Sequence, residues 1–194
     1  MDECLPLLKL FNVEHVYSPE DCTRFFLEEK RAGGEGKTFF ASARPCIVIK
    51  AGSTGPLLWS LKNGKISEGA ILTQDESGYH LHILEMKSKL TQGEWAKVML
   101  QFEGMHLTSM AVTRLLGVTE IKTVTCYITF KQNAMDASKS ADMILMKTFV
   151  GMPNIIGSGD AWESETIELP LTGIAGIKKA SRDSDNNADF GFIN

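Results

Sequence analysis

The chain has 194 residues, of which 43% are hydrophobic and 23% charged, and its formal net charge is −4. This composition excludes the disordered and fibrous classes and fits one soluble globular domain. The negative charge argues against a strongly basic surface that would hold DNA unaided. No apolar run approaches the roughly 18 to 20 residues of a membrane span, and the N-terminus is acidic, so we expect a cytoplasmic protein. The four scattered cysteines lack zinc-binding spacing, and we expect free, mostly buried thiols.

The first half of the chain predicts one helix followed by three strands. Ser18-Pro19-Glu20 is a good helix start, because a capping serine precedes a proline at the first helical position. We therefore predict a helix from about Pro19 to Arg31. The segment from Ala41 to Ala51 is apolar and predicts a buried strand. Two further extended runs, Glu68 to Gln74 and Tyr79 to Lys87, flank a turn sequence and predict a β-hairpin.

The second half predicts a long helix and further strands. Thr91-Gln92-Gly93-Glu94 is a capping box, and apolar residues then recur at helical spacing as far as Leu116. Ile121 to Phe130 predicts a strand, Asp136 to Val150 a helix and Glu165 to Leu171 another strand.

This order of elements predicts an α/β fold, in which a mixed central sheet is flanked by helices. We expect one domain over residues 1–180, with its core at about 18–130, followed by a polar C-terminal tail over residues 181–194. Residues 30–100 hold ten Lys and Arg against six Asp and Glu, although the whole chain is negative. The positive excess therefore lies around the predicted hairpin.

The hairpin brings acidic side chains together. With the turn centred between Glu76 and Ser77, paired residue numbers sum to 153, which places Glu68 opposite Glu85 at about 5 Å between Cβ atoms. Side chains alternate along a strand, so Lys87 points to the same face as Glu85. Two opposed carboxylates repel each other unless a cation lies between them, and oxygen ligands of this kind suit Mg²⁺ or Mn²⁺.

The segments from Ser67 to Leu72 and from Leu81 to Lys89 resemble the core motif of the PD-(D/E)XK nuclease superfamily, whose fold is restriction-endonuclease-like. The resemblance implies an α-β-β-β-α-β core. It also implies that Glu68 and Glu85 bind the metal, with the backbone carbonyl of Met86 as a further ligand, and that Lys87 is the catalytic lysine. Some members add an acid from the first helix, and Glu29 is the candidate here.

The sequence therefore predicts a Mg²⁺-dependent phosphodiesterase that cuts nucleic acid, with DNA expected over RNA. The residues expected to contact nucleic acid are Lys37, Lys62, Lys65, Lys89 and Gln101. Because the chain is acidic, we expect a partner subunit or self-association. By family analogy, a subunit of a bacterial restriction or phage-defence system fits. Two alternatives stay open: a catalytically inactive interaction subunit of the same fold, and a solvated salt-bridge cluster at the strand end.

Two other patterns in the sequence are weaker evidence for a phosphate-binding or metal-binding site. Gly33 to Thr38 resembles half of a phosphate-binding loop, but the chain has Arg31 where the motif requires its first glycine. His80 and His82 project to one face of the predicted strand, which is the face opposite Glu85, and no third metal ligand is in evident reach.

Overall fold

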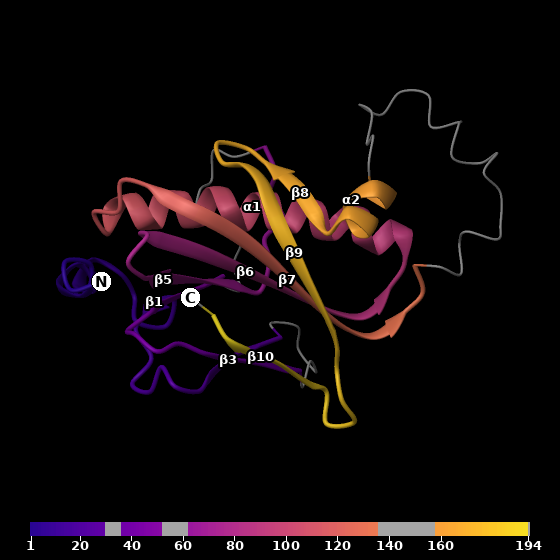
Figure 1. Ribbon diagram of the computed structural model, residues 1–194, viewed down its shortest axis with the longest axis horizontal. Coiled ribbons are helices and arrows are strands. Elements are labelled where there is room, and N and C mark those ends of the chain that lie inside the picture. Colours follow the sequence, from indigo (N-terminus) through magenta and orange to yellow (C-terminus); the bar gives the residue numbers. More distant parts are fainter. Residues whose placement is uncertain (30–35, 52–61, 136–157, 194) are drawn as a thin grey trace.

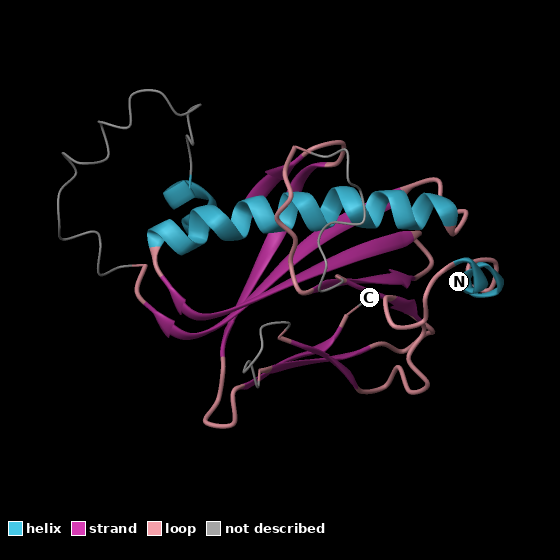
Figure 2. Ribbon diagram, turned by 180° about the vertical axis from the view of Figure 1, so that it is seen from behind, coloured by secondary structure: helices cyan, strands magenta, loops and turns pink. Residues whose placement is uncertain are grey.

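The computed structural model describes residues 1–29, 36–51, 62–135 and 158–193. The described part has three layers (Figures 1 and 2): a seven-stranded sheet lies between a long helix, α1, and a small three-stranded sheet. The mixed α/β class predicted from the sequence is confirmed, but the second layer of helices is replaced by strands.

The large sheet combines antiparallel and parallel pairs. Its first four strands pair antiparallel, whereas β6, β7 and β9 run parallel to one another and β8 closes the far edge antiparallel to β9. In spatial order the strands are β1 (Val16–Tyr17), β4 (Ile47–Lys50), β5 (Gly69–Gln74), β6 (Tyr79–Leu90), β7 (Ile121–Asn133), β9 (Gly173–Ser181) and β8 (Thr166–Leu169).

Helix α1 (Gln92–Leu115) connects β6 to the parallel strand β7 and covers one face of the large sheet. The hydroxyl of Thr91 accepts a hydrogen bond from the Glu94 amide at 3.3 Å, so the predicted N-terminal cap is confirmed. The apolar stripe of the helix, including Trp95 and Phe102, packs into the core. Both signals in the sequence were local, which is why they located the helix correctly.

The small sheet contains β2 (Phe25–Glu28), β3 (Lys37–Ala41) and β10 (Asn187–Phe192). Strand β2 lies where the sequence predicted a helix from Pro19 to Arg31, so that prediction is wrong. Phe25 and Leu27 are buried, whereas Phe26 and Glu28 face solvent, which is the alternation of a half-buried strand. Pairing with β3 and burial against the large sheet outweigh the capping signal at Ser18.

The predicted polar tail over residues 181–194 is also wrong. After a turn over Asp183–Asn186, the chain returns as β10, which pairs parallel with β3. Ala188 and Ile193 are buried, and the ring of Phe190 stacks on Phe40 at 5.7 Å between centroids. The polar residues 183–186 form the turn between β9 and β10, and the apolar residues after them bury β10 in the core.

Three other predictions meet different outcomes. The predicted strand over Ala41–Ala51 is split, because β3 ends at Ala41 and β4 begins only at Ile47. The predicted strand over Glu165–Leu171 corresponds to β8. The predicted helix over Asp136–Val150 lies outside the described residues, as does the first half of the Gly33–Thr38 segment. Two short helices, η1 (Leu5–Leu10) and α2 (Ser158–Ser164), complete the described elements.

His82 is buried between the two sheets, on the face opposite Glu85 as predicted. One ring nitrogen bonds the Thr73 hydroxyl at 3.0 Å and the other the Tyr127 hydroxyl at 3.2 Å. Burial, and then the positive charges of His80 and Lys178, lower the pKa of His82 from 6.5 to about 3. The imidazole is therefore neutral in the folded protein at every pH at which the fold is ordinarily studied.

We expect the free energy of unfolding to fall as the pH drops below about 6.5. The unfolded chain then binds a proton at His82 and the native protein does not, so the native state loses about 2 kcal/mol by pH 5. Urea unfolding at pH 7 and pH 5 measures this loss. His82→Gln should flatten the dependence in this window, and an equally steep dependence in the variant would show that another group is responsible.

Candidate functional site

The predicted hairpin exists and has the predicted register. Strands β5 and β6 pair from Gln74–Tyr79 to Gly69–Leu84, and each pair of residue numbers sums to 153. Strand β6 continues six residues beyond the last pair, where it is still paired with β7 on its other side. The candidate site lies on this extension.

Glu85 and Lys87 lie on the face of β6 that is covered by α1. Their neighbours on this face, Leu81 and Ile83, pack in the same apolar cluster as Phe102 of the helix. Only 1% of Glu85 is exposed, and the Lys87 ammonium lies 2.9 Å from its Oε1 atom. The structure therefore places a buried carboxylate beneath a lysine that is itself 18% exposed.

Gln101 of α1 completes this group. Its Oε1 atom accepts a hydrogen bond from the Lys87 ammonium at 2.8 Å, and its amide nitrogen donates to the Ile66 carbonyl at 3.5 Å. Lys87 is thus held between a carboxylate on its own strand and an amide on the helix. Gln101, predicted from the sequence as a contact for nucleic acid, is hydrogen-bonded to Lys87 in this structure.

The segment before β5, residues 62–68, lies along α1. The side-chain amide of Asn63 donates to the Leu100 carbonyl at 2.6 Å, and the Lys65 carbonyl approaches the backbone of Gly104. A Cβ atom at Gly104 would overlap that carbonyl oxygen. Glycine is therefore required at this point of the helix for the segment to reach the site.

We expect Gly104→Ala to destabilise the protein by roughly 1 to 3 kcal/mol, because the new methyl group forces the backbone at Lys65 away from α1. The matched control is Gly93→Ala in the first turn of the same helix, where a Cβ atom would meet nothing within 4 Å. That change should be neutral or stabilising by up to about 1 kcal/mol. Thermal unfolding of both variants compares them, and equal melting temperatures would contradict the packing described here.

Glu68 is not paired in the predicted way. Its amide donates to the Leu84 carbonyl at 3.0 Å, one residue short of the register that would set it against Glu85. Glu68 and Gly69 consequently share Leu84, as in a β-bulge. Carbonyls alternate along a strand, so the Met86 carbonyl points to the same strand edge as that of Leu84, just past the end of β5. Glu68 begins next to this edge and is half-buried.

The predicted ligands are hard oxygens, as Mg²⁺ requires: the carboxylates of Glu85 and Glu68 and the backbone carbonyl of Met86. In the described ranges, no three His, Cys, Asp or Glu side chains gather in a way that could hold a metal. Mg²⁺ commonly binds through only one or two carboxylates and keeps its waters, so this set fits it. The Lys87 ammonium lies 2.9 Å from Glu85 Oε1, so this carboxylate has a positive partner within the protein itself.

Glu29, a predicted further metal ligand, lies on the other side of the large sheet. Its Oε2 atom accepts a hydrogen bond from Arg182 at 2.9 Å, and the same guanidinium donates to the Thr129 hydroxyl at 3.3 Å. Thr129 alternates with Ile128, which packs on the α1 side, so its side chain points to the small sheet. The structure separates Glu29 from Glu85 by the thickness of the sheet, and its interaction with Arg182 is structural.

Most of the predicted nucleic-acid contacts gather near the site. Lys62 and Lys65 are exposed on the segment along α1, and Lys89 is exposed two residues beyond Lys87. A hydrogen bond from Lys97 lowers the pKa of Glu94, and the charges of Lys97, Lys87 and Lys65 act in the same direction. Lys65, Lys87 and Lys97 therefore lie close enough together to act on Glu94, and Lys97 is the one that the sequence reasoning missed.

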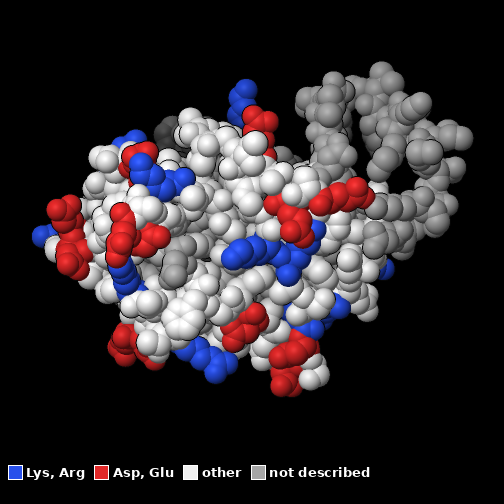
Figure 3. Space-filling view, in the orientation of Figure 1, with Lys and Arg blue, Asp and Glu red and all other residues white. Residues whose placement is uncertain are grey.

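Lys37 lies apart from this group. It belongs to the small sheet, where its ammonium is 3.5 Å from Glu28 and 4.6 Å from the ring centre of Phe26. On the face shown in Figure 3, acidic and basic side chains are interspersed. Lys37 therefore has local partners and is not placed to act with Lys87.

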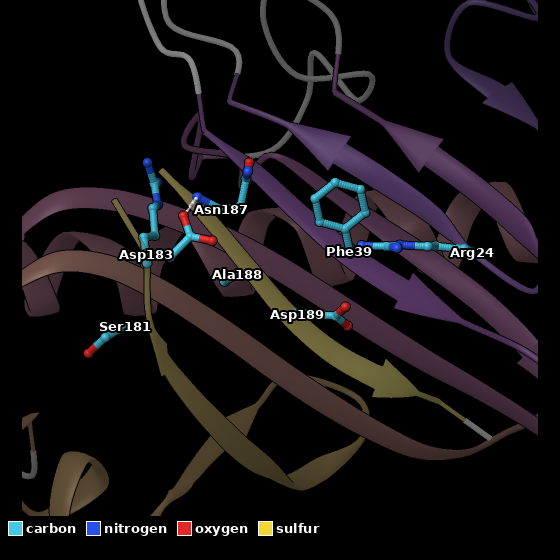
Figure 4. A pocket seen from close by; sticks show the side chains of 8 residues that line it. Arg24, Phe39, Ser181, Asp183, Asn187, Ala188 and Asp189 are labelled. Atoms are coloured by element: carbon cyan, nitrogen blue, oxygen red, sulfur yellow. Dashed lines mark hydrogen bonds between the residues drawn. The ribbon is translucent and has the colours of Figure 1, made fainter. Parts of the chain in front are cut away.

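A cavity of about 440 Å³ lies in the small-sheet layer, at β10 and the end of β9 (Figure 4). Its lining carries both signs of charge and includes Arg24, Phe39, Asp183, Asn187 and Asp189. The Asp183 carboxylate accepts a hydrogen bond from the backbone amide of Asn187 at 2.8 Å, at the edge of the cavity. This cavity is on the opposite side of the large sheet from Glu85 and is no part of the predicted site.

None of the described helices is long and apolar enough to cross a membrane. The chain matches no protein-family model, no curated protein and no solved structure. The candidate site therefore consists of Glu85 and Lys87 at the extended end of β6, together with Gln101 of α1.

Proposed function

We propose that this protein is a metal-dependent nuclease that hydrolyses phosphodiester bonds in nucleic acid, with DNA as the expected substrate. The observation that carries the proposal is the pairing of the buried Glu85 carboxylate with the Lys87 ammonium at 2.9 Å, at the end of the hairpin. An acid and a lysine two residues apart on a strand share one face, and here that face also has Gln101.

The order of elements supports a restriction-endonuclease-like core. Strands β4, β5 and β6 form an antiparallel meander, α1 crosses over, and β7 returns parallel to β6. The same β-β-β-α-β order is expected for the core of PD-(D/E)XK nucleases, in which the acid and the lysine lie on the third strand. The first helix of that core has no counterpart among the described residues, where β2 occupies the predicted position.

The residues that would hold Mg²⁺ are Glu85, the Met86 carbonyl and Glu68. When bound, the ion supplies Lewis-acid activation of the phosphate and of the attacking water. Lys87 can orient that water and stabilise the negative charge that develops on the phosphate oxygens, because its ammonium is fixed by two partners. Gln101 acts on the reaction through Lys87 and is a positioning residue.

The lysines around the site support a polyanionic substrate. Lys62, Lys65 and Lys89 are exposed, and each has a side chain long enough to follow a phosphate backbone. Because the chain has a net charge of −4, these few contacts give weak and salt-sensitive binding. We therefore propose that a partner subunit, or a second copy of the chain, contributes to substrate binding, as in a restriction or phage-defence system.

The second candidate is a catalytically inactive interaction subunit of the same fold. The observation that favours it is the depth of Glu85, which is 1% exposed and already has a lysine as its counter-ion. In this case the Glu85–Lys87 pair stabilises the hairpin and no metal enters.

Cleavage assays separate the two candidates. We expect the purified protein to cut plasmid or single-stranded DNA with Mg²⁺ or Mn²⁺ and to stop when EDTA is added. Inactivity with both metals on DNA and RNA, also in the presence of co-purifying partners, would reject the nuclease. Cleavage that persists in EDTA would reject the metal-dependent mechanism.

A further inference from the structure

Two of the four cysteines are in contact between the sheets. The Sγ atoms of Cys22 and Cys46 are 3.6 Å apart, although the residues are 24 positions apart in the chain. Cys46 directly precedes β4 and is fully buried, whereas Cys22 is half-buried in the bends that lead to β2. Both pack against the apolar cluster that joins the small sheet to the large one.

We propose that Cys22 and Cys46 are an oxidative modification site and form an intramolecular disulfide when the protein meets a two-electron oxidant such as hydrogen peroxide. A disulfide bond is about 2.05 Å long, so the sulfurs have to approach by roughly 1.5 Å. Cys22 lies in irregular chain and not in a strand, so its backbone can follow this movement without breaking a ladder.

Oxidation of the two thiols by peroxide takes place in two steps. The Cys22 thiolate attacks one peroxide oxygen, the O–O bond breaks, and a sulfenic acid and hydroxide result, which takes a proton to become water. The Cys46 sulfur then attacks the Cys22 sulfur. The S–S bond forms, the S–O bond breaks, and the hydroxyl leaves with the Cys46 proton as a second water. In total, two thiols are oxidised and one peroxide is reduced.

The surroundings decide which thiol reacts first. Burial, followed by the proximity of Cys22, raises the pKa of the Cys46 thiol well above its usual range, so Cys46 stays protonated. Cys22 is the partner that solvent reaches. Among the described residues, neither of the other two cysteines is hydrogen-bonded to a cysteine: Cys4 contacts the Tyr79 hydroxyl at 3.6 Å, and Cys126 is buried on the α1 side.

The cross-link would attach the segment before β2 to β4, and hence the small sheet to the large sheet. The disulfide would close a loop between residues 24 positions apart, and this lowers the conformational entropy of the unfolded chain and so stabilises the fold. We expect the melting temperature to rise by roughly 5 to 10 °C on oxidation and to return when dithiothreitol is added.

The test is peptide mapping of the wild-type protein after peroxide treatment. We expect one disulfide-linked peptide pair, Cys22 with Cys46, and a fall from four to two in the thiols that react after unfolding. Sulfinic acid at Cys22 without the cross-link, or pairing with Cys4 or Cys126, would overturn the proposal. As a control, Cys22→Ser should lose the cross-link and the shift in melting temperature, whereas Cys4→Ser should keep both.

Discussion

Replacing Glu85 with glutamine is expected to lower metal-dependent cleavage at least about a hundred-fold. The substitution keeps the shape of the side chain and removes the charge that would hold the cation and that pairs with Lys87 at 2.9 Å. The initial rate of plasmid nicking with Mg²⁺ measures the loss. A second readout, Mn²⁺ binding by calorimetry, should weaken in the variant even where no turnover is followed.

Glu94→Gln is the matched control for this experiment. Glu94 is an acid on α1 close to the same lysines, but its partner is Lys97 and its side chain is 34% exposed. We expect its cleavage rate to stay within a few-fold of wild type. Cleavage by Glu85→Gln at the wild-type rate would show that the site is placed wrongly. Equal losses of cleavage rate in both variants would point to a general effect of charge.

The largest loss of stability is expected from Glu29→Ala. Arg182 has a side chain that is 0% exposed, and Glu29 provides its counter-ion at 2.9 Å. Removing one partner of a buried ion pair leaves the other charge uncompensated, which costs roughly 3 to 5 kcal/mol. Chemical denaturation at neutral pH should show the free energy of unfolding lowered by that amount, through a lower midpoint with the slope of the transition unchanged.

The neighbouring residue offers the control. Glu28 pairs with Lys37 at 3.5 Å, but about half of each side chain is exposed, so Glu28→Ala should cost less than about 1 kcal/mol. Two adjacent glutamates are thus expected to differ several-fold in effect. Similar losses in the two variants would contradict the burial of the Glu29–Arg182 pair.

The sequence predicts best those elements whose signals are local. The capping box at Thr91 and the turn between β5 and β6 depend on residues within a few positions, and both located their elements correctly. Strand β2 has only four residues, too few for their alternation to compete with a helix signal at Ser18. Its identity as a strand depends on β3 and on the core beneath it, which are tertiary contacts.

The candidate site divides in the same way. Alternation along β6 and the spacing of α1 were enough to bring Lys87 and Gln101 towards Glu85. The shift at Glu68 occurs next to Gly69, where a Cβ atom would lie 3.0 Å from the Ile49 carbonyl, a contact with another strand. No local pattern could reveal it. Glu29 bonds Arg182, which is 153 residues away in the chain. The sequence did not reveal this ion pair, and Glu29 was therefore predicted to be a metal ligand.

The small sheet takes β2 and β3 from the beginning of the chain and β10 from residues 187–192. During synthesis on the ribosome, the hairpin, α1 and β7 are complete before β10 has been made. The edge of β3 that pairs with β10 must wait until the last strand arrives, and until then Phe40 lacks the stacked ring of Phe190. Such long-range pairing is slow and leaves apolar surface open to aggregation. We infer that folding finishes at this sheet, after the layer that carries Glu85 has formed.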